Sequence, residues 1–294
     1  MIGYILAISA AAIWSMVALS ATRIVRYFGS YNYNLLRLIG IIIIFLPYVV
    51  TNWDPIYFSK SIIVAIFLSS LIGIIIGDTF LFICLKRLGP RRQALLFSLQ
   101  IPFTIVLAEI FLKTLPSIIE LLGCFLIFFG IIVAIQFNRT IPDDDLENIQ
   151  GNKYIGLFAG VGLALCQAVG IILMKPALEE TDPIVVSYVR VLIAALIMFL
   201  SLGFLKKNNL LKKMRDLKKT FYSIFLGFMG MGVGMTMLII ALKNGDPGII
   251  STLSSTMPIM IIPILWIVTR NYAGHLSLIG ATLTCFGTGI IFLS

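Results

Sequence analysis

The sequence alternates between ten long runs of apolar residues and short polar connections. The runs lie at about 3–25, 32–52, 61–84, 91–112, 116–137, 154–175, 184–205, 221–242, 247–268 and 274–293. A helix that crosses the hydrocarbon core of a bilayer needs about 20 apolar residues. Each run meets that length, so the pattern predicts an all-α membrane protein with ten transmembrane helices.

The second half of the sequence repeats the first at an offset of 153 to 157 residues. At offset 153, Arg37 falls on Arg190. At offset 157, residues Gly73, Gly77, Thr79, Leu81, Leu85, Lys86 and Pro90 fall on identical residues of the second half. The sequence therefore predicts two five-helix repeats, residues 1–137 and 154–294, joined by a linker at 138–153.

An odd number of spans in each repeat places the two repeats in opposite orientations across the membrane. Inverted repeats of this kind are typical of secondary transporters, whose substrate lies near the midplane where the repeats meet. The runs at 91–112 and 247–268 contain internal prolines, Pro102 in the first and Pro258 and Pro263 in the second. Proline interrupts a helix, and a matched pair of interrupted helices indicates a transporter's binding site.

Composition agrees with a membrane protein. Hydrophobic residues make up 60% of the chain and charged residues 12%, against roughly 25% charged residues in soluble domains, and the mean hydropathy is +1.05. All four cysteines lie inside apolar runs, which favours small buried side chains over disulfides or metal ligands. We expect one integral membrane domain without cofactor or metal, and the run at 3–25 as a retained span.

The basic residues predict the orientation. The connections after the odd-numbered runs contain 16 of the 22 Lys and Arg residues, and the other connections contain four. The positive-inside rule then places the odd connections in the cytoplasm and both termini outside. The basic stretch Lys206–Lys219 would lie along the inner leaflet, attracted by anionic lipid. This surplus accounts for the net charge of +9 without a nucleic-acid partner.

Uncharged polar side chains near the centres of the runs are candidate substrate contacts. These residues are Trp14, Ser98, Gln100, Gln167, Ser255 and Thr256, with Thr79 and Thr236 at equivalent positions of the two repeats. Trp14 and Gln167 are also equivalent, at offset 153. A set of this kind fits a central cavity for a small molecule. Hydrogen bonding between helices would explain the same residues.

Ionised residues inside membrane helices are candidates for function. Arg37 and Asp78 approach one membrane face, and Glu109 and Arg190 approach the other. We expect two acid–base sets, one for each gate of an alternating-access cycle. A static ion pair, or snorkelling near an interface, would place the residues similarly. Proton coupling through Asp78 or Glu109 stays open.

Several segments resemble the EamA family of the drug/metabolite transporter superfamily. They include Ala11–Ser15, Leu36–Leu38, Leu163–Ala168, Tyr188–Val191, Ala94–Pro102, Leu122–Gly130 and Ile279–Gly287. The resemblance covers the whole chain and implies a ten-helix metabolite exporter or exchanger. Two features depart from it. The family often has Gly-Glu after its fourth and ninth spans, where this chain has Lys113-Thr114 and Thr269-Arg270, and its members usually have cytoplasmic termini.

The sequence therefore favours a secondary active transporter that moves a small metabolite or drug, by export or exchange, in the plasma membrane of a prokaryote. A lipid flippase or scramblase is the alternative. A membrane enzyme is disfavoured, because the chain has one histidine, His275, and no clustered catalytic or metal ligands. Small-molecule substrate and membrane lipids are the expected partners. The substrate and its coupling to protons or to an exchanged molecule stay open, as does the choice between monomer and homodimer.

Overall fold

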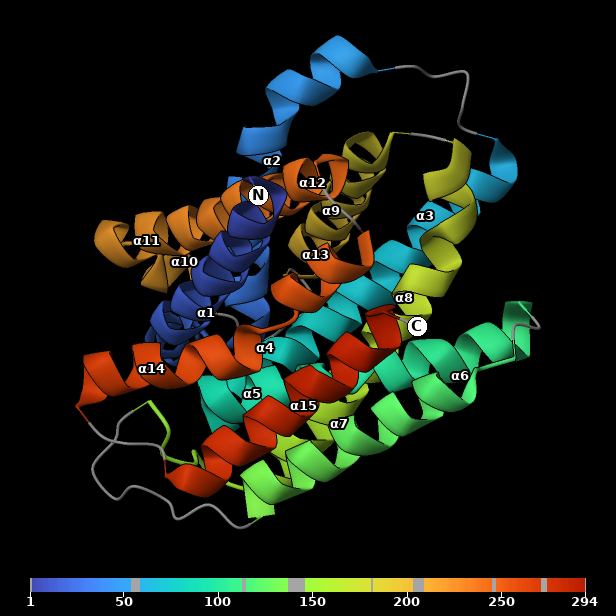
Figure 1. The fold of residues 1–294 in the computed structure, drawn as a ribbon. Coiled ribbons are helices and arrows are strands. Elements are labelled where there is room, and N and C mark those ends of the chain that lie inside the picture. Colours follow the sequence, from blue (N-terminus) through green and yellow to red (C-terminus); the bar gives the residue numbers. More distant parts are fainter. Residues whose placement is uncertain are drawn as a thin grey trace.

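The computed structural model describes residues 2–53, 59–112, 115–136, 146–180, 182–202, 209–244, 247–270 and 274–293. Within these ranges, ten helices are long and apolar enough to cross a membrane, which confirms the predicted fold class. Figure 1 shows them as one helical bundle. The predicted span ends at residues 137 and 205 lie outside the described residues.

Six of the spans are continuous helices. They are α1 (Ile2–Phe28), α2 (Ser30–Asn52), α7 (Ile118–Gln136), α8 (Lys153–Glu180), α9 (Pro183–Ser201) and α15 (His275–Leu293). A short helix, α10 (Leu210–Lys213), precedes the eighth span. Large apolar side chains such as Ile43, Phe125 and Phe199 are exposed on the outer faces, as expected of surfaces that contact lipid.

The other four spans are irregular, and they correspond in pairs between the repeats. The third span consists of α3 (Lys60–Ser69), the π-helix η2 (Ser70–Gly77) and α4 (Asp78–Leu88), and the eighth of α11 (Leu217–Gly227), the π-helix η4 (Phe228–Gly234) and α12 (Met235–Lys243). The fourth span breaks between α5 (Pro90–Phe97) and α6 (Gln100–Leu112), and the ninth between α13 (Pro247–Ser254) and α14 (Met257–Thr269). The predicted interruption of the fourth and ninth spans is confirmed.

The two repeats interlock rather than pack as separate blocks. Helix α1 of the first repeat packs against η4, α12, α13 and α14 of the second, and α8 packs against α3, η2, α4, α5 and α6 of the first. Helices α2 and α9 also pack against each other across the repeats. The first helix of each repeat therefore contacts the irregular spans of the other, and this interlocking brings the candidate site residues together.

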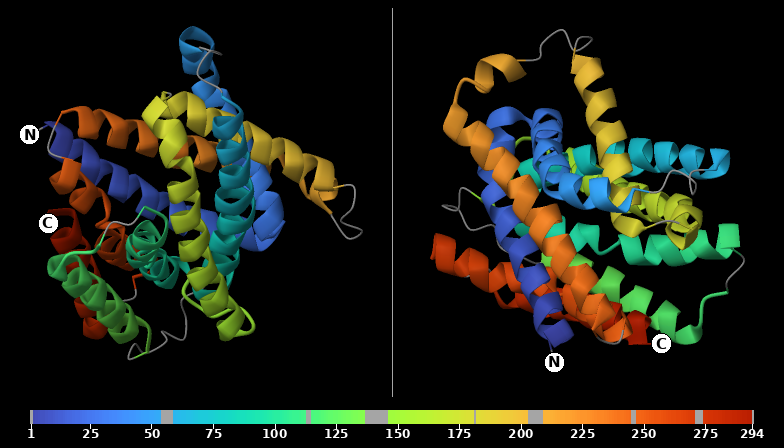
Figure 2. Two further views of the ribbon diagram at one scale, coloured as in Figure 1. Left: turned by 90° about the vertical axis from the view of Figure 1, so that its right-hand side faces the viewer. Right: turned by 90° about the horizontal axis from the view of Figure 1, so that it is seen from above.

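Helices α7 and α15 lie side by side (Figures 1 and 2) and approach closely at four glycines. A Cβ at Gly130 would lie 2.6 Å from the carbonyl oxygen of Gly280, and one at Gly287 would lie 2.6 Å from that of Gly123. Both contacts are too short for any side chain. Because Gly123 and Gly130 correspond to Gly280 and Gly287 at offset 157, the two repeats make the same contact twice. Small residues permit close helix packing in membranes.

Candidate functional site

The third and eighth spans contain π-helical segments at the same position of their repeats. Gly73 and Gly77 of η2 correspond to Gly230 and Gly234 of η4. π-Helical turns are rare and are frequent at functional sites. Their altered hydrogen-bond register leaves carbonyl oxygens in need of other donors, since lipid offers none.

Equivalent side chains donate to equivalent carbonyls in the two π-helices. Nε2 of Gln167 donates to the carbonyl oxygen of Gly73 (3.3 Å), and Nε1 of Trp14 donates to that of Gly230 (2.7 Å). A Cβ at Gly234 would lie 2.5 Å from Nε1 of Trp14, so only glycine permits this approach of the indole. Two residues predicted to contact substrate are therefore used, in this conformation, to hold the π-helices.

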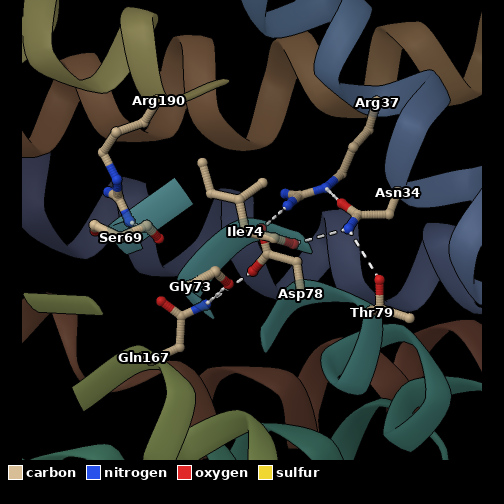
Figure 3. A network of polar contacts seen from close by, with 9 residues as sticks. All are labelled: Asn34, Arg37, Ser69, Gly73, Ile74, Asp78, Thr79, Gln167 and Arg190. Atoms are coloured by element: carbon tan, nitrogen blue, oxygen red, sulfur yellow. Dashed lines mark hydrogen bonds and ion pairs between the residues drawn. The ribbon is translucent and has the colours of Figure 1, made fainter. Parts of the chain in front are cut away.

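Asp78, at the junction of η2 and α4, is the centre of a buried polar network (Figure 3). Its Oδ2 pairs with Nη2 of Arg37, and its Oδ1 accepts a hydrogen bond from Nε2 of Gln167 at 2.8 Å. The predicted proximity of Arg37 and Asp78 is thus observed. Because both carboxylate oxygens have donors, the charge of Asp78 is compensated within a low-dielectric interior.

Arg37 is oriented by further contacts from its own helix and from α4. Its Nε donates to Oδ1 of Asn34 at 3.0 Å, and its guanidinium carbon lies 4.9 Å from the ring centre of Phe82. The amide of Asn34 in turn donates to the carbonyl oxygen of Ile74 (3.0 Å) and to Oγ1 of Thr79 (3.4 Å). The network therefore ties α2 to both η2 and α4.

Arg190 and Glu109, expected to form the second acid–base set, are not brought together. Arg190 extends from α9 toward the same π-helical span as Arg37 (Figure 3), and its Nη2 donates to the carbonyl oxygen of Ser69 at 3.3 Å. Counting residues along the spans placed Arg190 and Glu109 at similar depths in the membrane. Arg190 nevertheless contacts the third span, whereas Glu109 is exposed on the surface of α6.

The remaining predicted contacts lie at or near the breaks of the fourth and ninth spans. Ser98 is buried and donates to the carbonyl oxygen of Ala94, while Gln100 begins α6. The hydroxyls of Ser255 and Thr256 donate to carbonyl oxygens in the preceding turn. Thr79 belongs to the Asp78 network, and Thr236 donates to the carbonyl oxygen of Gly232 at 2.5 Å.

A second buried ionic cluster, which the sequence analysis did not single out, lies in the connection between the repeats. The carboxylate of Glu147 pairs with Arg91 (3.1 Å) and Arg92 (3.5 Å), and its side chain is 2% exposed. Arg26 donates to the carbonyl oxygens of Leu146 and Asn148, both at 3.2 Å. Arg26, Arg91 and Arg92, which the positive-inside count used only to predict the orientation, thus hold the linker against the bundle.

The described residues contain no group of three or more His, Cys, Asp or Glu side chains that could hold a metal ion. The four cysteines, all described, are free thiols. The chemistry available at the site is therefore that of amides, hydroxyls, one indole and ion pairs, which suits reversible binding of a small molecule.

Removing one donor from each π-helix should loosen the two segments separately. Trp14→Phe keeps an aromatic ring but leaves the carbonyl of Gly230 without its donor, a change that typically costs about 1–3 kcal/mol. Hydrogen exchange should rise in η4 but not in η2, and Gln167→Met should give the reverse. Equal protection in both variants and the wild type would show that these bonds do not hold the π-helices.

Comparison with known proteins agrees with this architecture. The family model of EamA-like transporters matches residues 1–136 and 154–293, once for each repeat. One solved crystal structure of a protein shares the fold, with a TM-score of 0.63 and 14% sequence identity. The match covers 99% of this chain and 96% of the chain in that structure. No curated protein matches the sequence. Because the family model covers both repeats, the chain belongs to the EamA-like transporter family.

Proposed function

We propose that this protein is a secondary active transporter that moves a small metabolite or drug by alternating access, with export or exchange as its direction. The observation that carries the proposal is the Arg37–Asp78 pair beside a π-helix, at the place where the repeats interlock. Inverted-repeat transporters bind substrate at such broken helices between repeats. Family membership supports a transporter of this type.

The hydrogen bonds to the π-helices suggest how the gates work. Trp14 and Gln167 each reach from the first helix of one repeat to a backbone carbonyl of the other. Rocking of one repeat against the other would break these bonds and the bond from Gln167 to Asp78. The Arg37–Asp78 pair lies within the first repeat, so it would separate only if α2 also moved against α4. We propose Arg37 and Asp78 as the gating pair, with Asp78 free to take a proton once Arg37 moves away. Glu109 has no role in this proposal.

Among the predicted substrate contacts, Gln100 is the best placed to bind a ligand in this conformation. Its side chain is half-buried at the break between α5 and α6, and its amide makes no hydrogen bond to any described residue. We propose that Gln100 contacts the substrate, together with Ser98 at the same break and Ser255 and Thr256 at the matching break of the ninth span. Trp14 and Gln167, with Thr79 and Thr236, become available when the π-helices rearrange.

Transport by purified protein tests the proposal. Proteoliposomes are preloaded with one unlabelled compound from a panel of amino acids, nucleosides, quaternary amines and carboxylates. They should accumulate the same compound in labelled form by counterflow, and liposomes without the protein should not. Asp78→Asn should abolish or slow this exchange. Movement of fluorescent lipid between the leaflets, with no counterflow of any soluble compound, would instead establish the flippase or scramblase alternative.

The positive-inside count supports an orientation with both termini outside the plasma membrane of a prokaryote, as proposed from the sequence. In that orientation the cluster around Glu147, in the connection after the fifth span, lies on the cytoplasmic side.

A further inference from the structure

Arg190 is a membrane-embedded arginine that pairs with no carboxylate of the residues the structure describes. Its Nη2 donates to one backbone carbonyl, that of Ser69. Its Nε is buried and makes no hydrogen bond. No Asp or Glu of the described residues lies within 4.0 Å of its guanidinium nitrogens. The residue as a whole is half-buried.

The internal repeat shows why Arg190 lacks such a partner. Arg37, its equivalent at offset 153, pairs with Asp78. The residue that corresponds to Asp78 at offset 157 is Met235. The second repeat thus keeps the arginine and replaces its acid with an apolar side chain. Arg190 turns instead toward the π-helical span that carries Asp78 (Figure 3).

The charges around η2 therefore do not cancel. Arg37 and Arg190 contribute two positive charges and Asp78 contributes one negative charge, which leaves a net charge of +1. A buried charge without a counterion is costly in a membrane interior. The guanidinium packs against the backbone of η2 and α8, because a Cβ at Gly73 would lie 2.9 Å from Nη2 of Arg190 and one at Gly170 would lie 3.7 Å from it. The two glycines therefore leave the space beside η2 that this cation occupies.

We propose that Arg190 binds the negative charge of the transported molecule, and that this molecule is a monocarboxylate. The inference rests on the proposed transport function and names its substrate class. One net positive charge matches one carboxylate, whereas a phosphate monoester carries about −1.5 to −2. The planar guanidinium, with Nε and the Nη atoms as donors, fits a carboxylate in a bidentate manner.

Binding to detergent-purified protein tests the assignment without relying on transport. The midpoint of thermal unfolding is measured with a panel of monocarboxylates and their primary amides, headed by benzoate and benzamide, with inorganic phosphate and chloride as separate arms. The variants are Arg190→Gln and Arg190→Lys. Lys212→Gln, which removes the same charge from an exposed position on α10, is the matched control.

At least one monocarboxylate should stabilise the wild type and the Lys212→Gln control, and its amide should not. Its affinity should fall about ten- to hundredfold in Arg190→Gln, as when a hydrogen bond to a charged group is lost, and less in Arg190→Lys. Stabilisation by phosphate or chloride alone, by amides as strongly as by acids, or by none of the probes overturns the assignment. So does unchanged affinity in Arg190→Gln.

Counterflow in proteoliposomes distinguishes failure of the anion site from failure of the proposed transport function. Carboxylate binding that depends on Arg190, with no counterflow of that carboxylate, would contradict transport but retain the anion site. Counterflow of a neutral or cationic compound at the same rate in Arg190→Gln would retain transport and overturn the anion site.

Discussion

Replacing Asp78 with alanine is expected to destabilise the protein by about 3–5 kcal/mol, since it leaves Arg37 as an uncompensated charge in the membrane interior. The loss also removes an acceptor from Gln167, a side chain that donates to a carbonyl oxygen of η2. The thermal midpoint in detergent and the yield of monodisperse protein measure the effect. Glu109→Ala is the control, because that carboxylate is exposed on α6 and its loss should leave stability nearly unchanged.

The double substitution Arg37→Met with Asp78→Leu separates stability from function. Replacing a buried ion pair with apolar residues of similar volume is often neutral for stability, so this variant should fold better than Asp78→Ala. It should nevertheless fail to transport if the pair forms part of a gate. Wild-type counterflow by the stable double variant would reduce the pair to a structural contact, and equal stability of Asp78→Ala and the wild type would contradict the network itself.

Glu147→Gln is expected to release the linker from the bundle. The change keeps the shape of the side chain but removes the charge that compensates Arg91 and Arg92, both of which are buried. Breaking a buried pair typically costs about 3–5 kcal/mol. Limited proteolysis between residues 137 and 153 should become faster, and the thermal midpoint should fall.

Asp216→Asn makes the same change at a partly exposed ion pair with Lys219, and should have little effect because solvent screens that pair. The amide oxygen of asparagine can still accept the hydrogen bond from the backbone of Lys219 that caps α11. Similar proteolysis of Glu147→Gln and Asp216→Asn would show that the buried cluster does not hold the linker.

The sequence predicted the features that depend on position along the chain. Span lengths follow from runs of apolar residues, and the breaks near Ser98 and Ser255 follow from matched prolines. The offset of 153 also identified Trp14 and Gln167 as equivalent, and the structure shows them making equivalent bonds. That they would bond to backbone carbonyls was not predicted, although glycines recurring at η2 and η4 were a signal of unusual helix geometry.

Features that depend on the direction of a side chain around its helix could not be predicted in this way. Depth alone placed Glu109 with Arg190, whereas Arg190 faces the span that carries Asp78. Depth was sufficient to pair Arg37 with Asp78 because their helices, α2 and α4, pack against each other. Glu147 was missed because its partners come from another connection, Arg91 and Arg92, and no spacing in the sequence links the two segments.

The paired glycine contacts between α7 and α15 have a consequence for assembly. Gly123 meets Gly287, and Gly130 meets Gly280, so one surface patch contacts its own counterpart. This is the isologous geometry of a twofold homodimer, in which the same patch serves both subunits. A single five-helix repeat made as its own chain would present Gly123 to Gly130 of a second copy inserted the opposite way. In this respect the protein is a symmetric dimer whose two subunits share one chain.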